Sequence, residues 1–123
     1  RFDAARAVDA IEAHRITAFT ATPTMLQRIA DLPGIEDRDL SSIDWILQGA
    51  APMPPALVHR WVGLIGAERI LFGTDAMTFP RGIVSAYLDS QVRDCVELGF
   101  SEQEVRGILG ENFLRAFQQV WGA

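Results

Sequence analysis

The stretch that decides the fold is ITAFTATPTMLQRIADLPG, residues 16–34. Its first part, residues 16–20, is short and rich in β-branched and aromatic residues, which predicts a β-strand. Thr22-Pro23 then predicts the start of a helix, because the hydroxyl can cap free N–H groups and proline is tolerated at the first helical position. Pro33-Gly34 is expected to end this helix. A strand followed at once by a helix is the repeating unit of parallel sheets.

The same alternation extends on both sides of this stretch. Apolar side chains at helical spacing predict helices over residues 3–14 and 55–65. Short apolar runs predict two further strands, at residues 43–47 and 69–72. The sequence therefore predicts an α/β fold: a small three-stranded parallel sheet with flanking helices, within a single domain over residues 1–123.

The last forty residues are expected to be helical and to form a C-terminal helical hairpin. Ser101 and Glu104 match the capping-box pattern. Cys95 falls in the apolar stripe of the preceding helix and is expected in the core. The final helix, capped by Asn112, is expected to be buried through Phe113, Leu114, Phe117, Val120 and Trp121. A mostly helical oligomer stays open as an alternative, because short apolar runs do not fix their own secondary structure.

Composition narrows the function classes. The chain has 123 residues, 49% of them hydrophobic, and a net charge of −5, which makes nucleic acid an improbable partner. No apolar run approaches the ~20 residues of a membrane helix. A single cysteine excludes an internal disulfide and fits the cytoplasm. A small sheet with open edges favours self-association, so we expect a homo-oligomer, most simply a dimer, that acts on a small-molecule substrate.

Four collinear stretches carry a family resemblance: FDAARAVDAIEAHRIT (2–17), TPTMLQRIADLP (22–33), DLSSIDWILQGAAPMPPALVHRW (39–61) and GAERI (66–70). Through them, residues 2–70 resemble an internal segment of the adenylate-forming acyl-CoA synthetases. The resemblance implies that the turn Gly49, Ala50, Ala51 and Pro52 lies against the adenine of ATP.

The chain then departs from that family. Where the family has a Tyr-Gly-x-Thr-Glu motif, this chain has Phe72-Gly73-Thr74-Asp75, which is one residue short. The family's phosphate-binding loop is absent. Its catalytic C-terminal lysine has no counterpart either, because the chain has eleven arginines and no lysine. We therefore do not expect a competent acyl-CoA ligase.

A second resemblance covers residues 67–123. AERILFGTDA (67–76), FPRGI (79–83) and GFSEQEVRGILGENFLRAFQQVW (99–121) resemble the C-terminal end of amidohydrolase-superfamily metal-dependent hydrolases, closest to the membrane-dipeptidase-like branch. The resemblance implies that Asp75 ends the last barrel strand and binds metal or acts as a base. The whole chain thus resembles a chimera, with its seam at residues 67–70.

These observations predict a small metal-dependent hydrolase. A divalent zinc, manganese or iron ion would activate a water molecule, held by Asp75, His59 and His14, with Asp75 as the catalytic group. Combined with the adenine-facing turn, this site predicts a phosphodiesterase acting on an adenine nucleotide, such as a cyclic one.

Simpler roles stay open for the same residues. His14 ends a helix, where an imidazole suits the helix dipole. His59 fits a surface position, and Asp75 fits a turn. Two other functions also stay open: a non-catalytic remnant that binds adenine nucleotide or acyl-CoA, and a recombination product that folds by hydrophobic patterning without activity.

Overall fold

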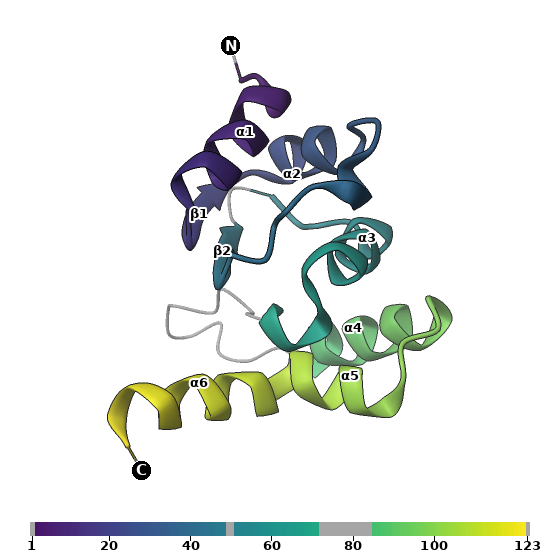
Figure 1. The fold of residues 1–123 in the computed structure, drawn as a ribbon. Helices are drawn as coiled ribbons and strands as arrows, with labels where there is room; N and C mark the ends of the chain where they lie inside the picture. The colour runs from purple at the N-terminus through teal and green to yellow at the C-terminus, as the bar shows by residue number, and fades with distance from the viewer. Residues whose placement is uncertain (1, 49–50, 72–84, 123) are drawn as a thin grey trace. The chain divides into compact units, whose positions relative to one another are not determined.

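The computed structural model describes residues 2–48, 51–71 and 85–122, and its ribbon is drawn in Figure 1. The chain divides into two compact units, Arg1–Gly66 and Ala67–Ala123. The boundary coincides with the seam expected from the sequence at residues 67–70. That the two units together form one domain stays a prediction.

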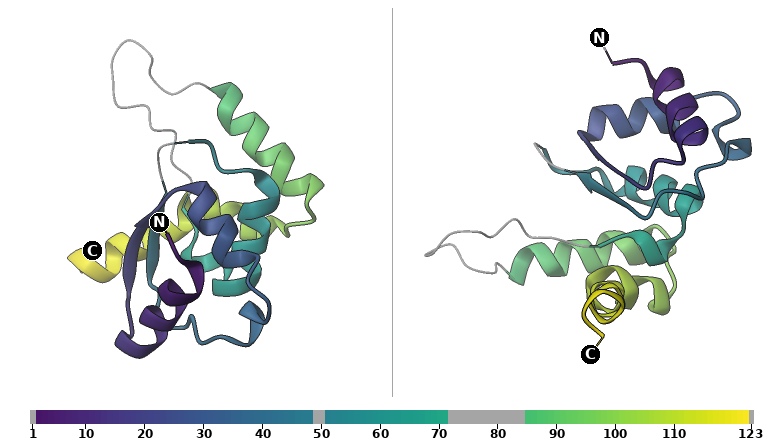
Figure 2. Two further views of the ribbon diagram at one scale, coloured as in Figure 1. Left: turned by 90° about the horizontal axis from the view of Figure 1, so that it is seen from above. Right: turned by 60° about the vertical axis from the view of Figure 1, so that its left-hand side comes forward.

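Unit 1 alternates helix and strand along the chain. Its strands β1 and β2 pair in parallel, with Ala18 opposite Trp45 and Ala21 opposite Gln48. Figure 1 and the left view of Figure 2 place α2 and α3 on the same side of the strand pair. The predicted α/β class is therefore confirmed. The elements are α1 (Ala4–His14), β1 (Ala18–Ala21), α2 (Pro23–Ala30), the 3-10 turn η1 (Ile35–Asp37), β2 (Trp45–Gln48) and α3 (Pro55–Ile65).

The third strand predicted at residues 69–72 is wrong for the residues that the structure describes. The 3-10 turn η2 (Ala67–Arg69) takes its place, and the sheet has two strands. The N–H of Ile70 donates to the carbonyl of Ala67 at 3.2 Å, so the backbone closes on itself. A backbone that satisfies its polar groups locally does not present them to a neighbouring strand.

The helix starts of unit 1 follow the sequence signals. Thr22 adopts an extended backbone, and its hydroxyl accepts from the N–H of Met25 at 3.4 Å, with Pro23 in the first helical position. Asp3 caps α1 in the same way, because its carboxylate accepts from the N–H of Arg6 at 3.1 Å. Both side chains satisfy N–H groups that a helix leaves without partners.

The core of unit 1 is built around the indole of Trp61 on α3. This side chain is 1% exposed, and its Nε1–H donates to the carbonyl of Leu26 on α2 at 3.3 Å. The bond satisfies the one polar atom of the ring, so the whole side chain can be buried. The other buried apolar residues of unit 1 are Val8, Ile11, Ala21, Leu26, Ile29, Ala30, Ile35, Leu40, Ile43, Leu57 and Ile65.

One face of β2 stays in contact with solvent. Trp45 and Leu47 are 52% and 58% exposed, whereas Ile46 between them is half-buried. Opposite Leu47 on β1, Thr20 is exposed as well. The helices therefore cover one face of the strand pair, and the other face presents apolar side chains.

Unit 2 is helical after its first turn, as predicted. Ser101 and Glu104 form the expected capping box, in which the N–H of Ser101 donates to Oε2 of Glu104 at 2.8 Å. Cys95 is buried, as predicted. The helices are α4 (Ser85–Glu97), α5 (Glu102–Arg106), the π-helical turn η3 (Gly107–Glu111) and α6 (Asn112–Trp121). No helix within the described ranges has the length and apolar character to span a membrane.

The predicted burial of the last helix is wrong. Phe113, Leu114, Phe117 and Trp121 are all exposed, and the side chain of Val120 lies outside the described set. Asn112 is the residue of α6 that is buried: its amide donates to the carbonyls of Ala67 at 2.8 Å and Ile70 at 2.9 Å. The helix is thus held at its first residue by polar bonds, and its apolar stripe faces solvent.

We predict that Trp61→Ala lowers the free energy of unfolding by about 3–5 kcal/mol, because it leaves a cavity at the centre of unit 1. Urea unfolding followed by circular dichroism measures the change. Trp45→Ala is the matched control, since this indole is half exposed, and its cost should stay below about 1 kcal/mol. Equal losses in the two variants would contradict this view of the core.

Candidate functional site

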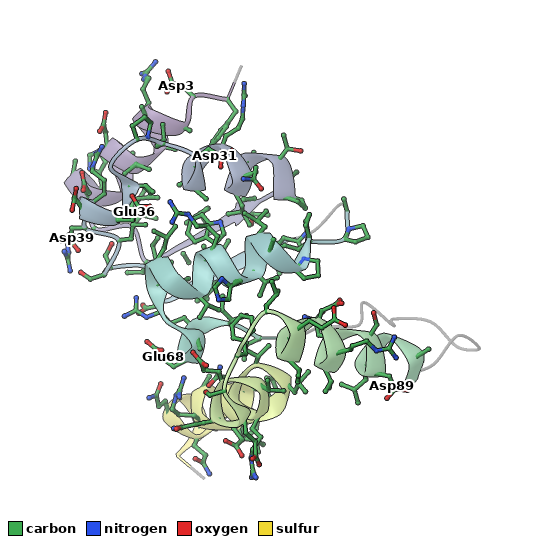
Figure 3. All side chains as sticks on the ribbon, turned by 90° about the vertical axis from the view of Figure 1, so that its right-hand side faces the viewer. Asp3, Asp31, Glu36, Asp39, Glu68 and Asp89 are labelled. Carbon is green, nitrogen blue, oxygen red and sulfur yellow. The ribbon has the colours of Figure 1, made fainter. Side chains whose placement is uncertain are left out.

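The structure does not assemble the predicted metal site. Asp75 lies outside the described residues. His14 ends α1 and His59 lies on α3, and both are exposed. Over residues 2–48, 51–71 and 85–122, no group of three or more histidines, cysteines or carboxylates converges on one point. In Figure 3 the labelled carboxylates of unit 1, among them Asp3, Asp31 and Asp39, lie well apart.

The candidate nucleotide turn connects β2 to α3. Gly49 and Ala50 lie outside the described residues, whereas Ala51 and Pro52 are described and exposed. The side-chain amide of Gln48 donates to the carbonyl of Ala51 at 2.6 Å, so the last residue of the strand restrains the end of the turn. A turn of small residues lets a flat ring approach the backbone closely.

A charged network that the sequence analysis missed joins α1 to the loop after η1. The Arg38 guanidinium donates from Nε to Glu12 at 2.9 Å and from Nη2 to Glu12 at 2.5 Å. It also reaches Asp9 at 2.6 Å. Asp9 and Glu12 are three residues apart and share a helix face, which was the available sequence signal for a cationic partner.

These bonds perturb the ionisation of their partners. The hydrogen bond from Arg38, with a second from the N–H of Asp39 at 2.8 Å, holds the pKa of Glu12 below its ordinary value. The hydroxyl and N–H of Ser41 likewise lower the pKa of Asp39, with a further contribution from Arg15 at 2.8 Å. The network fastens the loop to α1, and its groups bond to one another, which is a structural role.

Unit 2 holds a cavity of about 200 Å³ beside the start of α6. Asn112 and Gly107 line it, and a Cβ added at Gly107 would lie 3.1 Å from the Asn112 side chain. Glycine therefore makes room for the amide. Around it, Arg115 donates to the carbonyl of Glu68, and Glu111 accepts from Arg106 at 2.8 Å. These bonds hold the turn and helices of unit 2 together and place no reactive group in the cavity.

Comparison with known proteins gives one clear family match. A family model described as "AMP-binding enzyme" matches residues 1–77. A methyl-dioxo-octahydro-indenyl-propanoyl:CoA ligase of Mycobacterium tuberculosis is 46% identical over 70 residues, which are 57% of this chain and 14% of that protein. A feruloyl-CoA synthase of an Amycolatopsis species is 39% identical over 61 residues, which are 50% of this chain and 12% of that protein.

A solved structure agrees with these relatives. A mutant amide bond synthetase from Marinactinospora thermotolerans superposes with a TM-score of 0.50 at 31% identity, over 55% of this chain and 14% of that chain. This chain therefore spans about one seventh of the length of the proteins it matches.

The comparisons overturn the predicted hydrolase. The family match and both relatives are AMP-binding enzymes and CoA ligases, so the metal-dependent hydrolase, its phosphodiesterase activity and its zinc, manganese or iron cofactor are wrong. The amidohydrolase resemblance of residues 67–123 gains no support. The match to residues 1–77 includes Asp75, and so assigns the segment that suggested a barrel strand to a different family.

The Arg38 network makes unit 1 sensitive to acid. Because the pKa of folded Glu12 is lowered from 4.5, its contribution to stability is complete above pH 4.5 and is lost as the pH falls through the folded value. We predict that wild type exceeds Glu12→Gln in melting temperature at pH 7, and that the difference shrinks between pH 4.5 and pH 3.

Thermal unfolding at a series of pH values tests this expectation. Glu102→Gln is the matched control, because Glu102 is 89% exposed and lies 4.0 Å from Arg106. Its effect on the melting temperature should be small at every pH, since exposed pairs contribute little. A Glu12→Gln difference that is constant from pH 7 to pH 3 would refute the assignment.

Proposed function

The chain belongs to the AMP-binding enzyme family, and from that premise we propose that it is a non-catalytic module, derived from an AMP-dependent acyl-CoA synthetase, that binds an adenine nucleotide at the turn between β2 and α3. The observation that carries the proposal is the match over residues 1–77, which includes this strand, turn and helix without interruption. The turn comprises residues 49–52.

The geometry of the turn supports the ligand class. The carbonyl of Ala51 already accepts from Gln48, so the end of the turn is restrained before a ligand arrives. Less conformational freedom then remains to be lost on binding. The exposed Leu47 at the end of β2 adds an apolar surface against which a purine ring can pack.

The non-catalytic part of the proposal rests on the residues of this chain. The resemblance implies a catalytic lysine, and the sequence holds no lysine. An arginine is a poor substitute at such a position, because its planar guanidinium spreads the charge that an ammonium group concentrates at one point. We therefore propose binding without adenylation.

The remaining expectations follow the same proposal. The ligand is a small molecule, and neither nucleic acid nor a membrane surface is a partner. A net charge of −5 supports this choice, because both of those surfaces are predominantly anionic. The compartment is the cytoplasm, which the single buried cysteine supports.

Isothermal titration calorimetry of the full chain with AMP, ATP and CoA tests the proposal. We predict that AMP and ATP bind, and that Ala51→Glu raises their dissociation constants by about tenfold or more. The added carboxylate would occupy the turn and repel the phosphates. Ala13→Glu is the matched control, because Ala13 is also an exposed alanine of unit 1, and it should bind as wild type does.

Three results would count against the module. Absence of heat at millimolar AMP and ATP would exclude nucleotide binding. Equal weakening in Ala51→Glu and Ala13→Glu would remove the turn from the site. Binding of CoA alone would replace the adenine nucleotide by the acyl-CoA ligand that the sequence left open.

A further inference from the structure

The helix α6 exposes an apolar face that the rest of unit 2 does not cover. This aromatic face consists of Phe113, Leu114, Phe117 and Trp121, which are 57%, 60%, 42% and 67% exposed. Their spacing of three and four residues places them along one side of the helix. Single exposed apolar residues are ordinary on protein surfaces, but a contiguous stripe of four marks an interaction surface.

The side chains of the aromatic face are ordered against one another. The rings of Phe113 and Phe117 lie 6.2 Å apart between centroids, and Phe117 stacks on Trp121 at 4.4 Å with an interplanar angle of 29°. Both distances fall in the range of favourable aromatic pairs. Because the rings already support each other, a partner that covers them has little side-chain entropy left to remove.

We propose that the aromatic face pairs with the same face of a second copy of this chain, and so forms a two-fold symmetric dimer. Leu114, Phe117 and Trp121 stand at positions i, i+3 and i+7, which is the narrow apolar seam of paired helices. A surface that binds its own copy about a two-fold axis closes after two chains. This inference is independent of nucleotide binding.

The charge of α6 favours a second copy over a lipid surface. The helix carries one charged residue, Arg115, whose guanidinium donates to the carbonyl of Glu68. The aromatic face itself has no ionisable group, so two copies can meet there although each has a net charge of −5. Interfacial membrane helices instead carry several lysines or arginines beside their apolar face.

The exposed area is of the size that a modest dimer needs. The four side chains of the aromatic face expose on the order of 450 Å² together. Pairing two copies would bury about twice that area from these side chains alone, and neighbouring residues would add to it. Specific interfaces begin at about 1,000–1,200 Å², so we expect a dimer that depends strongly on each aromatic side chain.

Analytical ultracentrifugation of the full chain, from about 1 to about 100 μM, tests this inference. We predict a reversible equilibrium between the 13.6 kDa monomer and a species of twice that mass. Phe117→Glu should raise the dimer dissociation constant by about 30-fold or more, as expected for the centre of an interface. Gln118→Glu adds the same charge to the next residue of α6 and should leave the dimer intact.

Circular dichroism and a urea midpoint establish that each variant is folded. If Phe117→Glu does not fold, Trp121→Ser removes the largest ring near the end of the helix and should weaken the dimer instead. A wild-type monomer at 100 μM would overturn the inference, as would a dimer that survives both Phe117→Glu and Trp121→Ser. Equal loss in Gln118→Glu, or sedimentation of wild type with phosphatidylserine vesicles without dimer formation, would also overturn it.

Discussion

The parallel pairing of β1 and β2 is the constraint on which unit 1 depends. Parallel neighbours cannot be joined by a tight turn, so the chain must cross over between them, and here the crossover contains α2 and η1. A crossover helix needs an apolar surface to cover. Trp61 supplies it, since its buried ring bonds to the backbone of α2 and thereby ties α3 to the crossover.

Local signals predicted the elements well, and long-range packing was harder to predict. The caps at Thr22 and Ser101 lie within four residues of the groups they bond, so the sequence alone reveals them. The third strand and the burial of α6 failed for a common reason. The amide of Asn112 takes the carbonyls of Ala67 and Ile70, some forty residues away, and no periodicity in the sequence reports such a bond.

The functional prediction failed through the weight given to one residue. Asp75 suggested a metal site because of a short motif, whereas the match to AMP-binding enzymes extends over residues 1–77 and accounts for the same aspartate. Long collinear similarity constrains a whole backbone, but a single carboxylate after a glycine fits many turns. The adenine-facing turn at residues 49–52 came from the long resemblance and remains the candidate site.

The solvent-facing side of β2 has a consequence for how the two strands find their alignment. Strand register is ordinarily set by alternation of apolar and polar residues, because a one-residue slip exchanges the two faces. Trp45 and Leu47 point outward and Ile46 lies between them, so a slipped β2 would still offer an apolar surface to the helices. Alignment must then come from bonds at the strand entrance, where Ser42 donates to Ile16 at 3.0 Å and Asp44 to Thr17 at 2.7 Å. These contacts act as a latch that selects one of two nearly degenerate pairings.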